Sequence, residues 1–438
     1  MEATDRPAAW RTMPTEHART RSKDATRDLL RDGYTWADAA RARAADPAAR
    51  ALPVRLLGRP ALLVRGAEAV RFFYDGTLLR REGAVPLAVR LPLFGRGAVH
   101  GLDDGPHHRR KELFLRATEP RRRADLVAAA DAGWARAVAA GGPLDVHATA
   151  VRVHGRAVQR WAGIELPEAE LDRRAAGLAQ VVDGFGVPGP AWVQALRARR
   201  ESESWALELI GRTRLDAVRA GRAPDELSVL ELVAGHRGED GQLLPGHTAA
   251  VELLNLLRPT VAVSWFAAFA ALALHEHPGW ARRLREEAAG RATAVGGPEA
   301  TAFAHEVRRL FPFVPLLAAR ARRPLEWGGH RLEAGQRVVL DVHGTNTDPW
   351  EWERAGEFDP ARFLGTGAAA AANLVPQGGG EVAGGHRCPG EDVTVAVLAV
   401  AAAHLASRPW RTDPAGLRYD LHRMPTRPQG GPVLEPLA

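Results

Sequence analysis

Apolar residues recur along most of this chain at the three- and four-residue spacing that is typical of amphipathic helices. Two stretches depart from that spacing. Residues 53–65 predict two short strands around a turn at Gly58-Arg59-Pro60, and residues 322–341 contain a second β region. We therefore expect a mainly α protein with small β regions, with helices near residues 24–34, 106–118, 123–140, 145–163, 167–183, 189–220, 226–236, 246–275, 278–290, 298–311 and 389–407.

Composition and charge narrow the class of protein. The chain has 438 residues, of which 46% are hydrophobic, and a formal charge of +7. Its basic residues are dispersed among acids in the helical segments, which argues against nucleic-acid binding. Residues 1–22 lack periodicity, and no repeat or linker divides residues 23–438. We expect a flexible N-terminal tail followed by a single domain.

The longest apolar run and the N-terminus bear on localisation. The run covers residues 259–274, fewer than the roughly 20 residues that a membrane-spanning helix needs. We interpret it as a buried helix and expect no membrane anchor. The first residues lack the apolar core of a signal peptide. Together with a single thiol, this predicts a cytoplasmic protein.

Cys388 is the only cysteine, and it lies in the string Gly-Gly-His-Arg-Cys-Pro-Gly-Glu that ends at Glu391. One thiol excludes an intrachain disulfide and the usual multi-thiolate zinc and iron–sulfur sites. A buried core residue, a hydrolytic nucleophile and the single thiolate ligand of a haem iron remain open. The predicted helix that follows Cys388 would place the sulfur at a helix N-terminus, where the dipole stabilises a thiolate.

Two other motifs precede the cysteine. Glu306 and Arg309 are three residues apart and share one helix face, which alone is typical of a solvated ion pair. Residues 346–363 form a turn region rich in Pro and aromatic residues that includes Arg362. In this order the motifs resemble the cytochrome P450 superfamily. The resemblance implies the cytochrome P450 fold, haem b with Cys388 as the iron ligand, and a lock between Glu306, Arg309 and Arg362.

The central helix departs from the common pattern of that superfamily. Oxygen-activating members usually carry an acidic residue next to a threonine, whereas this chain has Arg258-Pro259-Thr260. Pro259 removes a backbone donor and predicts a kink. Arg258 follows the apolar residues Leu253, Leu254, Leu256 and Leu257, and a buried guanidinium needs an anion such as a carboxylate. The alternative is an ion pair with a protein carboxylate at the helix surface.

The strings around Arg258 and Cys388 resemble the fatty-acid peroxygenase branch of the superfamily. This resemblance implies hydrogen peroxide as co-substrate, a long-chain fatty acid as substrate and no obligatory redox partner. The substrate carboxylate would pair with Arg258, beside Pro259, and serve as acid–base, so oxidation would fall at Cα and Cβ. The alternatives are a ferredoxin-dependent monooxygenase, a cysteine hydrolase and a non-catalytic haem or lipid carrier.

Further residues receive roles from the resemblance. His100 would lie above the haem near the carboxylate, which adds decarboxylation to terminal alkenes beside α/β-hydroxylation; the alternative is an ordinary hydrogen-bonded histidine. His107 and Lys111 resemble a pair that binds a haem propionate, and a basic helix face is the alternative. The remaining candidates are cofactor-binding Arg320 and His386 and the substrate-binding residues Phe94, Phe313 and Val314.

Overall fold

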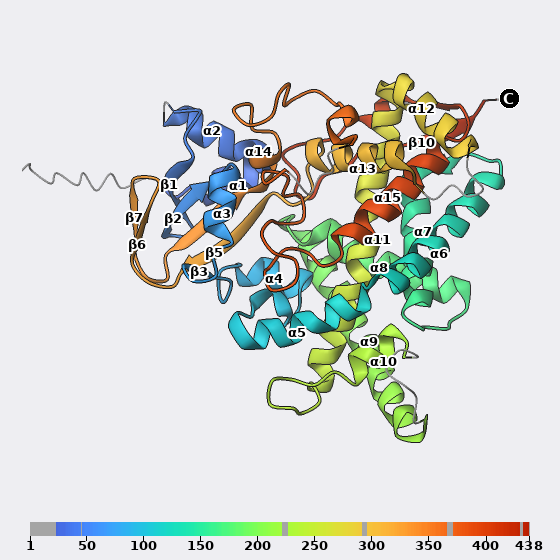
Figure 1. Ribbon diagram of the computed structural model, residues 1–438, viewed down its shortest axis with the longest axis horizontal. Helices are drawn as coiled ribbons and strands as arrows, with labels where there is room; N and C mark the ends of the chain where they lie inside the picture. Colours follow the sequence, from blue (N-terminus) through green and yellow to red (C-terminus); the bar gives the residue numbers. More distant parts are fainter. Residues whose placement is uncertain are drawn as a thin grey trace, which may run out of the picture.

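The computed structural model describes residues 23–44, 46–220, 227–290, 296–365, 371–429 and 432–437. The predicted tail, residues 1–22, lies outside these ranges. The described residues form a helical mass beside a smaller β region (Figure 1). The helices are α1 Thr26–Asp32, α2 Trp36–Arg43, α3 Ala67–Phe73, α4 Leu87–Leu93, α5 Asp104–Ala117, α6 Pro120–Ala139, α7 Val146–Trp161, α8 Glu168–Gly184, α9 Pro190–Ala220, α10 Val229–Ala234, α11 Gly246–Glu276, α12 Pro278–Ala289, α13 Pro298–Leu310, α14 Val342–Asn346 and α15 Glu391–Ala406.

The largest sheet has the strand order β1-β2-β8-β5-β3. Strands β2 and β8 run parallel, and the other neighbours pair antiparallel. A second sheet has the order β4-β10-β9, and β6 and β7 form a hairpin. The strands are β1 Ala51–Leu56, β2 Arg59–Val64, β3 Leu79–Arg80, β4 Leu144–Asp145, β5 Leu316–Ala321, β6 Leu325–Trp327, β7 His330–Leu332, β8 Arg337–Asp341, β9 Trp410–Thr412 and β10 Val433–Pro436.

Helix α11 forms the centre of the helical mass, where it passes beside α15 (Figure 1). Nearly every residue from Ala249 to Ala273 is buried, because α7, α8, α9, α13 and α15 pack around the helix. It is the one helix in the described ranges that is long and apolar enough to cross a membrane, yet 94% of its apolar window is buried inside the protein. This burial identifies α11 as a core helix, as the sequence predicts.

A buried ionic lock joins α13 to the loop before the cysteine. Arg309 donates to both carboxylate oxygens of Glu306 at 2.7 and 2.8 Å, and Arg362 Nε donates to Glu306 Oε1 at 3.2 Å. The side chains of Glu306 and Arg309 are fully buried. A buried pair that is satisfied in this way fixes the relative position of the segments that it joins. The predicted lock therefore forms, and the surface ion-pair alternative is wrong.

Candidate functional site

The cysteine lies just before α15, as predicted. The backbone N–H of Cys388 donates to the Gln377 carbonyl at 3.2 Å, and α15 begins three residues later, at Glu391. Burial raises the pKa of the thiol, while the Gly390 N–H and the cations Lys111 and Arg308 partly oppose this effect. The helix N-terminus alone is therefore insufficient to ionise the sulfur. A thiolate here needs a metal cation as well.

A side-chain network that the sequence reasoning missed surrounds the sulfur. Gln377 Nε2 lies 3.8 Å from Cys388 Sγ and donates to Thr394 Oγ1 at 2.8 Å. Its Oε1 accepts from Arg308 Nε at 3.1 Å, and Arg308 also pairs with Glu391 at 2.5 Å. The buried guanidinium polarises the amide and orients its N–H groups toward the sulfur. The string Gln-Gly-Gly-Gly that begins at Gln377 was the feature of the sequence that could have identified this network.

The three glycines after Gln377 have a packing reason. Gly378 and Gly380 adopt φ values of +93° and +73°, which favour glycine. A Cβ at Gly378 would lie 2.5 Å from the Tyr74 hydroxyl, and one at Gly379 would lie 2.6 Å from Val70. Val70 of helix α3 and Tyr74, the residue after α3, thus pack against residues 378–380. This packing fixes the position of the loop that precedes Cys388.

A buried basic cluster lies at one side of the cysteine loop. Lys111 Nζ donates to the carbonyls of Gly385 and Arg387 at 2.8 and 2.6 Å, and the rings of His107 and His386 are 4.0 Å apart. His107 and Lys111 are each 3% exposed, so a solvated basic face is excluded. Burial lowers the pKa of Lys111 to about 8 and that of His107 to about 3. The structure thus brings together three of the four predicted cofactor-binding side chains around the loop.

Arg320, the fourth, makes no hydrogen bond or ion pair with this cluster among the described residues. Its Nε donates to the Gly83 carbonyl at 2.9 Å from a half-buried position on β5. Arg81 is nearer: it is 9% exposed, and the Nη1 atom is buried without a hydrogen-bond partner among the described residues. Its guanidinium lies 4.0 Å from the Phe73 ring and repels a proton on His386. No local pattern in the sequence marks Arg81, because its burial arises from the contact with Phe73 of α3.

Arg258 is 7% exposed on α11 and has no carboxylate partner in the described part of the chain. Its Nη2 makes a long contact of 3.4 Å with Asn255 Oδ1, and its Nε is buried without a partner. Burial, with repulsion from Arg199, lowers its pKa to about 9, whereas Cys388 acts in the opposite direction. The guanidinium thus stays charged at neutral pH. The predicted surface ion pair is absent, and Arg258 lacks an anion.

His100 lies beside Arg258 across one aromatic ring. The His100 imidazole stacks on Phe94 at 4.0 Å, and the Arg258 guanidinium lies 5.8 Å from the same ring. His100 Nδ1 is buried and has no partner within the described ranges, so His100 is not the satisfied histidine of the alternative reading. Burial first, and then Arg258, hold its pKa well below 6.5. At neutral pH the imidazole is therefore uncharged.

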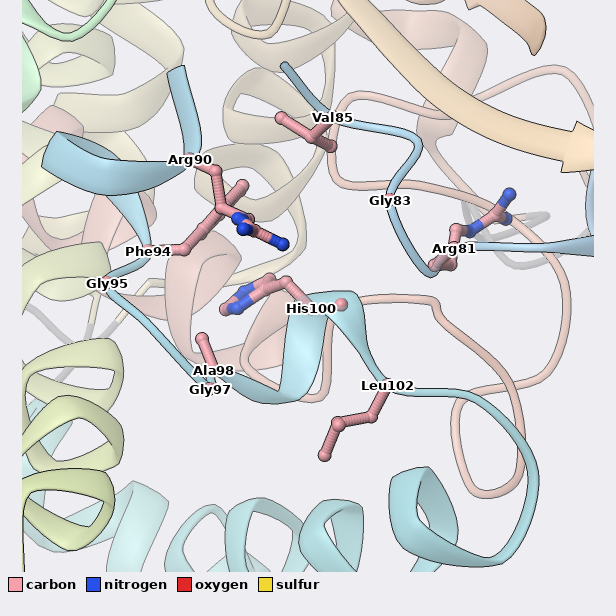
Figure 2. A pocket seen from close by; sticks show the side chains of 11 residues that line it. Arg81, Gly83, Val85, Arg90, Phe94, Gly95, Gly97, Ala98, His100 and Leu102 are labelled. Carbon is pink, nitrogen blue, oxygen red and sulfur yellow. The ribbon is translucent and has the colours of Figure 1, made fainter. Parts of the chain in front are cut away.

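A cavity opens on the other side of His100. Arg90, Phe94 and His100 lie together on one side of it, and Arg81 lies at the opposite side (Figure 2). None of the residues that line it is acidic. The polar side chains in the lining, Arg81, Arg90 and His100, are cations or possible donors, and the rest of the lining is glycine or apolar. This combination suits a ligand with an anionic group and an apolar body.

The only acid on α11 close to Arg258 is already engaged. Glu252 is fully buried and accepts hydrogen bonds from Arg110 at 2.6 Å and from the Val99 N–H at 2.8 Å. It also accepts from Asn255 at 3.2 Å. These contacts attach the His100 loop to α11. Glu252 therefore positions the loop and is not a free proton donor next to Thr260.

The expected substrate-pocket residues lie in two places. Phe94 touches the Arg258 and His100 group. Phe313 packs 5.4 Å from Phe266 and 6.4 Å from Trp265 on α11. Val314, the next residue, packs against the core cluster of the largest sheet. Phe94 and Phe313 thus lie against different residues of the same helix, α11.

Comparison with known proteins resolves the identity of this arrangement. A family model described as cytochrome P450 matches residues 259–405. The solved structure of cytochrome P450SP alpha in complex with (R)-ibuprofen is 35% identical to this chain, with a TM-score of 0.84. That match covers 94% of this chain and 98% of the other. The chain belongs to the cytochrome P450 family.

Two more relatives of this P450 show how far the likeness extends. Cytochrome P450EX alpha with myristic acid is 33% identical, with a TM-score of 0.83 and coverage of 94% of this chain and 96% of the other. Cytochrome P450 137 of Mycobacterium tuberculosis is 39% identical over 194 residues, which span 43% of this chain and 38% of that relative. The P450 fold and the resemblance to the peroxygenase branch are confirmed.

The cofactor of this P450 is a haem iron, and the residues present fit it. The described ranges contain no group of three or more His, Cys, Asp or Glu side chains that could hold a metal alone, so Cys388 suits an iron whose other ligands come from a porphyrin. The basic cluster of His107, Lys111 and His386 suits the propionates. Arg258 and Cys388 influence each other's charge, which places the unpaired guanidinium near the iron site.

Proposed function

We propose that this P450 oxidises free fatty acids at Cα and Cβ with hydrogen peroxide. The products are α- and β-hydroxy acids, with decarboxylation to terminal alkenes as a parallel outcome. One observation carries the proposal: Arg258 is a buried cation with no carboxylate partner among the described residues. Such a charge costs several kcal/mol unless an anion joins it. The substrate carboxylate supplies that anion.

The ligands of the solved relatives support a carboxylic acid. P450EX alpha is described with myristic acid, and P450SP alpha with (R)-ibuprofen. Both ligands carry a carboxylate next to an apolar body. In this chain the same chemistry suits Arg258, which lies among the buried leucines Leu254 and Leu257.

Each side chain has a defined part in the reaction. The bound haem supplies the oxidising chemistry. Arg258 holds the substrate carboxylate through its forked guanidinium. The carboxylate then takes a proton from peroxide and returns it to the departing oxygen. Pro259 frees the Asn255 carbonyl by its missing N–H, and Cys388 donates electron density through its thiolate. Since the carboxylate is fixed, the nearest carbons, Cα and Cβ, react.

His100 enters this mechanism as a neutral group. Its lowered pKa leaves the imidazole uncharged at neutral pH, so it donates or accepts one hydrogen bond without adding a second cation. The stack on Phe94 fixes the ring beside Arg258. A neutral imidazole leaves the bound carboxylate ionised and ready to act as the base.

A ferredoxin-dependent monooxygenase is the second candidate. It needs an acid near Thr260 to deliver protons to bound dioxygen. Thr260 follows Pro259 directly, and Glu252 is occupied by Arg110, Val99 and Asn255. The carboxylate on Arg258 replaces the missing acid only when peroxide is the oxidant. We therefore favour a cytoplasmic enzyme that needs no redox partner.

Product analysis tests the proposal. The holoenzyme is mixed with hydrogen peroxide and a series of saturated fatty acids, with no reductase present, and the products are analysed by mass spectrometry. We expect 2- and 3-hydroxy acids, together with alkenes one carbon shorter. The result that overturns the proposal is oxidation only when ferredoxin and its reductase are added, or oxidation at the far end of the chain.

A further inference from the structure

A second set of unpaired donors lies farther along α11. Trp265 Nε1, His147 Nε2 and Arg427 Nε are each buried and have no hydrogen-bond partner among the described residues. The His147 ring meets the Trp265 indole edge-on at 4.6 Å, and the Arg427 guanidinium lies 5.9 Å from the indole. Three separate segments, α7, α11 and the C-terminal loop, therefore bring buried nitrogens without hydrogen-bond partners to one place.

This His147/Trp265/Arg427 cluster shares a helix face with Arg258. Arg258, Ala262 and Trp265 follow one another at spacings of four and three residues, which places them on the same side of α11. At 1.5 Å per residue, Trp265 lies roughly 10 Å beyond Arg258 along the helix axis. Ala262 and Trp265 share a core cluster with Phe313. The face thus connects the carboxylate anchor to an expected pocket residue.

The unpartnered indole N–H needs an acceptor. Trp265 is 0% exposed, and an indole N–H can only donate. A buried donor without a partner is destabilising, so Trp265 Nε1, beside the Arg427 guanidinium, indicates a ligand group that accepts hydrogen bonds. A plain alkyl chain would leave the indole N–H unsatisfied.

The charges around the cluster nearly balance. Arg427 Nε lies 3.9 Å from Asp183, and Arg423 pairs with the same carboxylate at 2.7 Å. Burial and Arg427 lower the pKa of His147 to about 3, so the imidazole is neutral. The cluster therefore has no large excess charge, and it suits a hydroxyl as well as a carboxylate.

We propose that this cluster binds a second oxygen function at the far end of the substrate. On the function proposed above, Arg258 holds the first carboxylate. The preferred substrates are then medium-chain fatty acids whose last carbon carries a hydroxyl or carboxyl group. Oxidation still falls at Cα and Cβ of the end held by Arg258, because the cluster fixes only the distant end.

Ligand titrations test this proposal. The haem-loaded enzyme is titrated with a plain fatty acid, the ω-hydroxy acid and the α,ω-dicarboxylic acid of equal length, over several chain lengths, and affinity is read from the Soret shift. We expect an affinity about tenfold higher for an ω-oxygenated acid at the matching length, the effect of one or two hydrogen bonds in a buried site. The affinities of the ω-hydroxy acid and the α,ω-dicarboxylic acid, compared with each other, show which oxygen function is preferred.

Trp265→Phe removes the N–H and keeps the ring, and it should abolish the preference for the ω-oxygenated acid, read as the ratio of its affinity to that of the plain acid. Trp134→Phe is the matched control, because Trp134 is equally buried but already donates to His154 at 3.2 Å. The ratio of two affinities within one variant cancels any general loss of folded protein.

Two outcomes overturn the inference. Equal affinities for the plain and ω-oxygenated acids at every length exclude a second anchor. A preference that persists in Trp265→Phe places the anchor elsewhere. Neither outcome affects the proposed function, which fails only if plain fatty acids give no peroxide-dependent products at Cα or Cβ.

Discussion

At the scale of single residues, Arg258 and Cys388 have different parts in the proposed function. Cys388 would ligate the haem iron, while Arg258 would select the substrate group that reaches it. Many arginines in the described ranges pair with carboxylates, as Arg110 does with Glu252. Arg258 has only a long contact to Asn255. An unpaired buried guanidinium is costly unless a ligand completes it, so it marks a binding site.

Gln377 gives a prediction at the same scale. Its amide donates toward the Cys388 sulfur, and a hydrogen bond to a thiolate reduces the electron density that reaches the iron. Gln377→Leu should lower the iron reduction potential by about 40 mV, since one hydrogen bond contributes roughly 1 kcal/mol and 59 mV corresponds to about 1.4 kcal/mol for one electron. Spectroelectrochemical titration measures the shift.

Thr394→Val serves as the control for Gln377. It removes the other acceptor of the Gln377 amide and leaves the donor to sulfur in place, so the potential should not fall. An unchanged potential in Gln377→Leu would show that the 3.8 Å contact has no effect on the thiolate.

At the scale of elements, the sequence predicts the long helices closely, whereas it did not predict the short helices α2, α3, α4 and α14. The predicted helix at residues 246–275 is α11, Gly246–Glu276, and the helix predicted at 298–311 is α13, Pro298–Leu310. Long apolar periodicity and proline at the first helical turn carry enough local information to fix these boundaries. The strong helix signal also explains why the family motifs could be placed on the correct elements.

Strand β5 shows where local information ends. Its sequence, Leu-Leu-Ala-Ala-Arg-Ala, has the composition of a helix, and we placed the second β region only from residue 322 onward. Pairing with β8 makes it a strand, and that partner comes from the tertiary fold. The same limit applies to α4, which contains Pro92 and has no clear apolar period.

The candidate site was predictable where resemblance or local pattern named a residue. Arg258, His107 and Lys111 are buried, and His100 is half-buried, around one region, as the motifs imply. Gln377 carried a local signal in the string that begins with it, whereas the position of Arg81 could not be predicted, because it arises from contacts between distant segments. Burial raises the pKa of the Cys388 thiol once the loop is packed, a contribution that the helix N-terminus alone does not reveal.

At the scale of the whole molecule, buried neutral histidines contribute to the pH dependence of the free energy of unfolding. His147 and His154 have their pKa values lowered to about 3 by burial. In the unfolded chain a histidine takes up a proton near pH 6.5, whereas these folded residues do not. The unfolded state therefore binds more protons, and the free energy of unfolding must fall as the pH drops below about 6.5.

His154→Gln should reduce that slope. Each such histidine contributes about 1.4 kcal/mol per pH unit well below pH 6.5, and His154 is fully buried with Trp134 and Ser264 as its partners. Urea unfolding of the holoenzyme between pH 7.5 and pH 4.5 gives the slope for both proteins. Equal slopes would mean that His154 is protonated in the folded state.

We propose that the substrate carboxylate, held by Arg258, is the acid–base for peroxide cleavage. The most direct measurement is peroxide-dependent turnover of a fatty acid and of its methyl ester, in the wild type and in Arg258→Ala. We predict that either change, to the ester or to the variant, lowers turnover by at least about a hundredfold, the usual contribution of a positioned acid–base group. Full turnover of the acid by Arg258→Ala, or of the ester by the wild type, would contradict this role of the carboxylate.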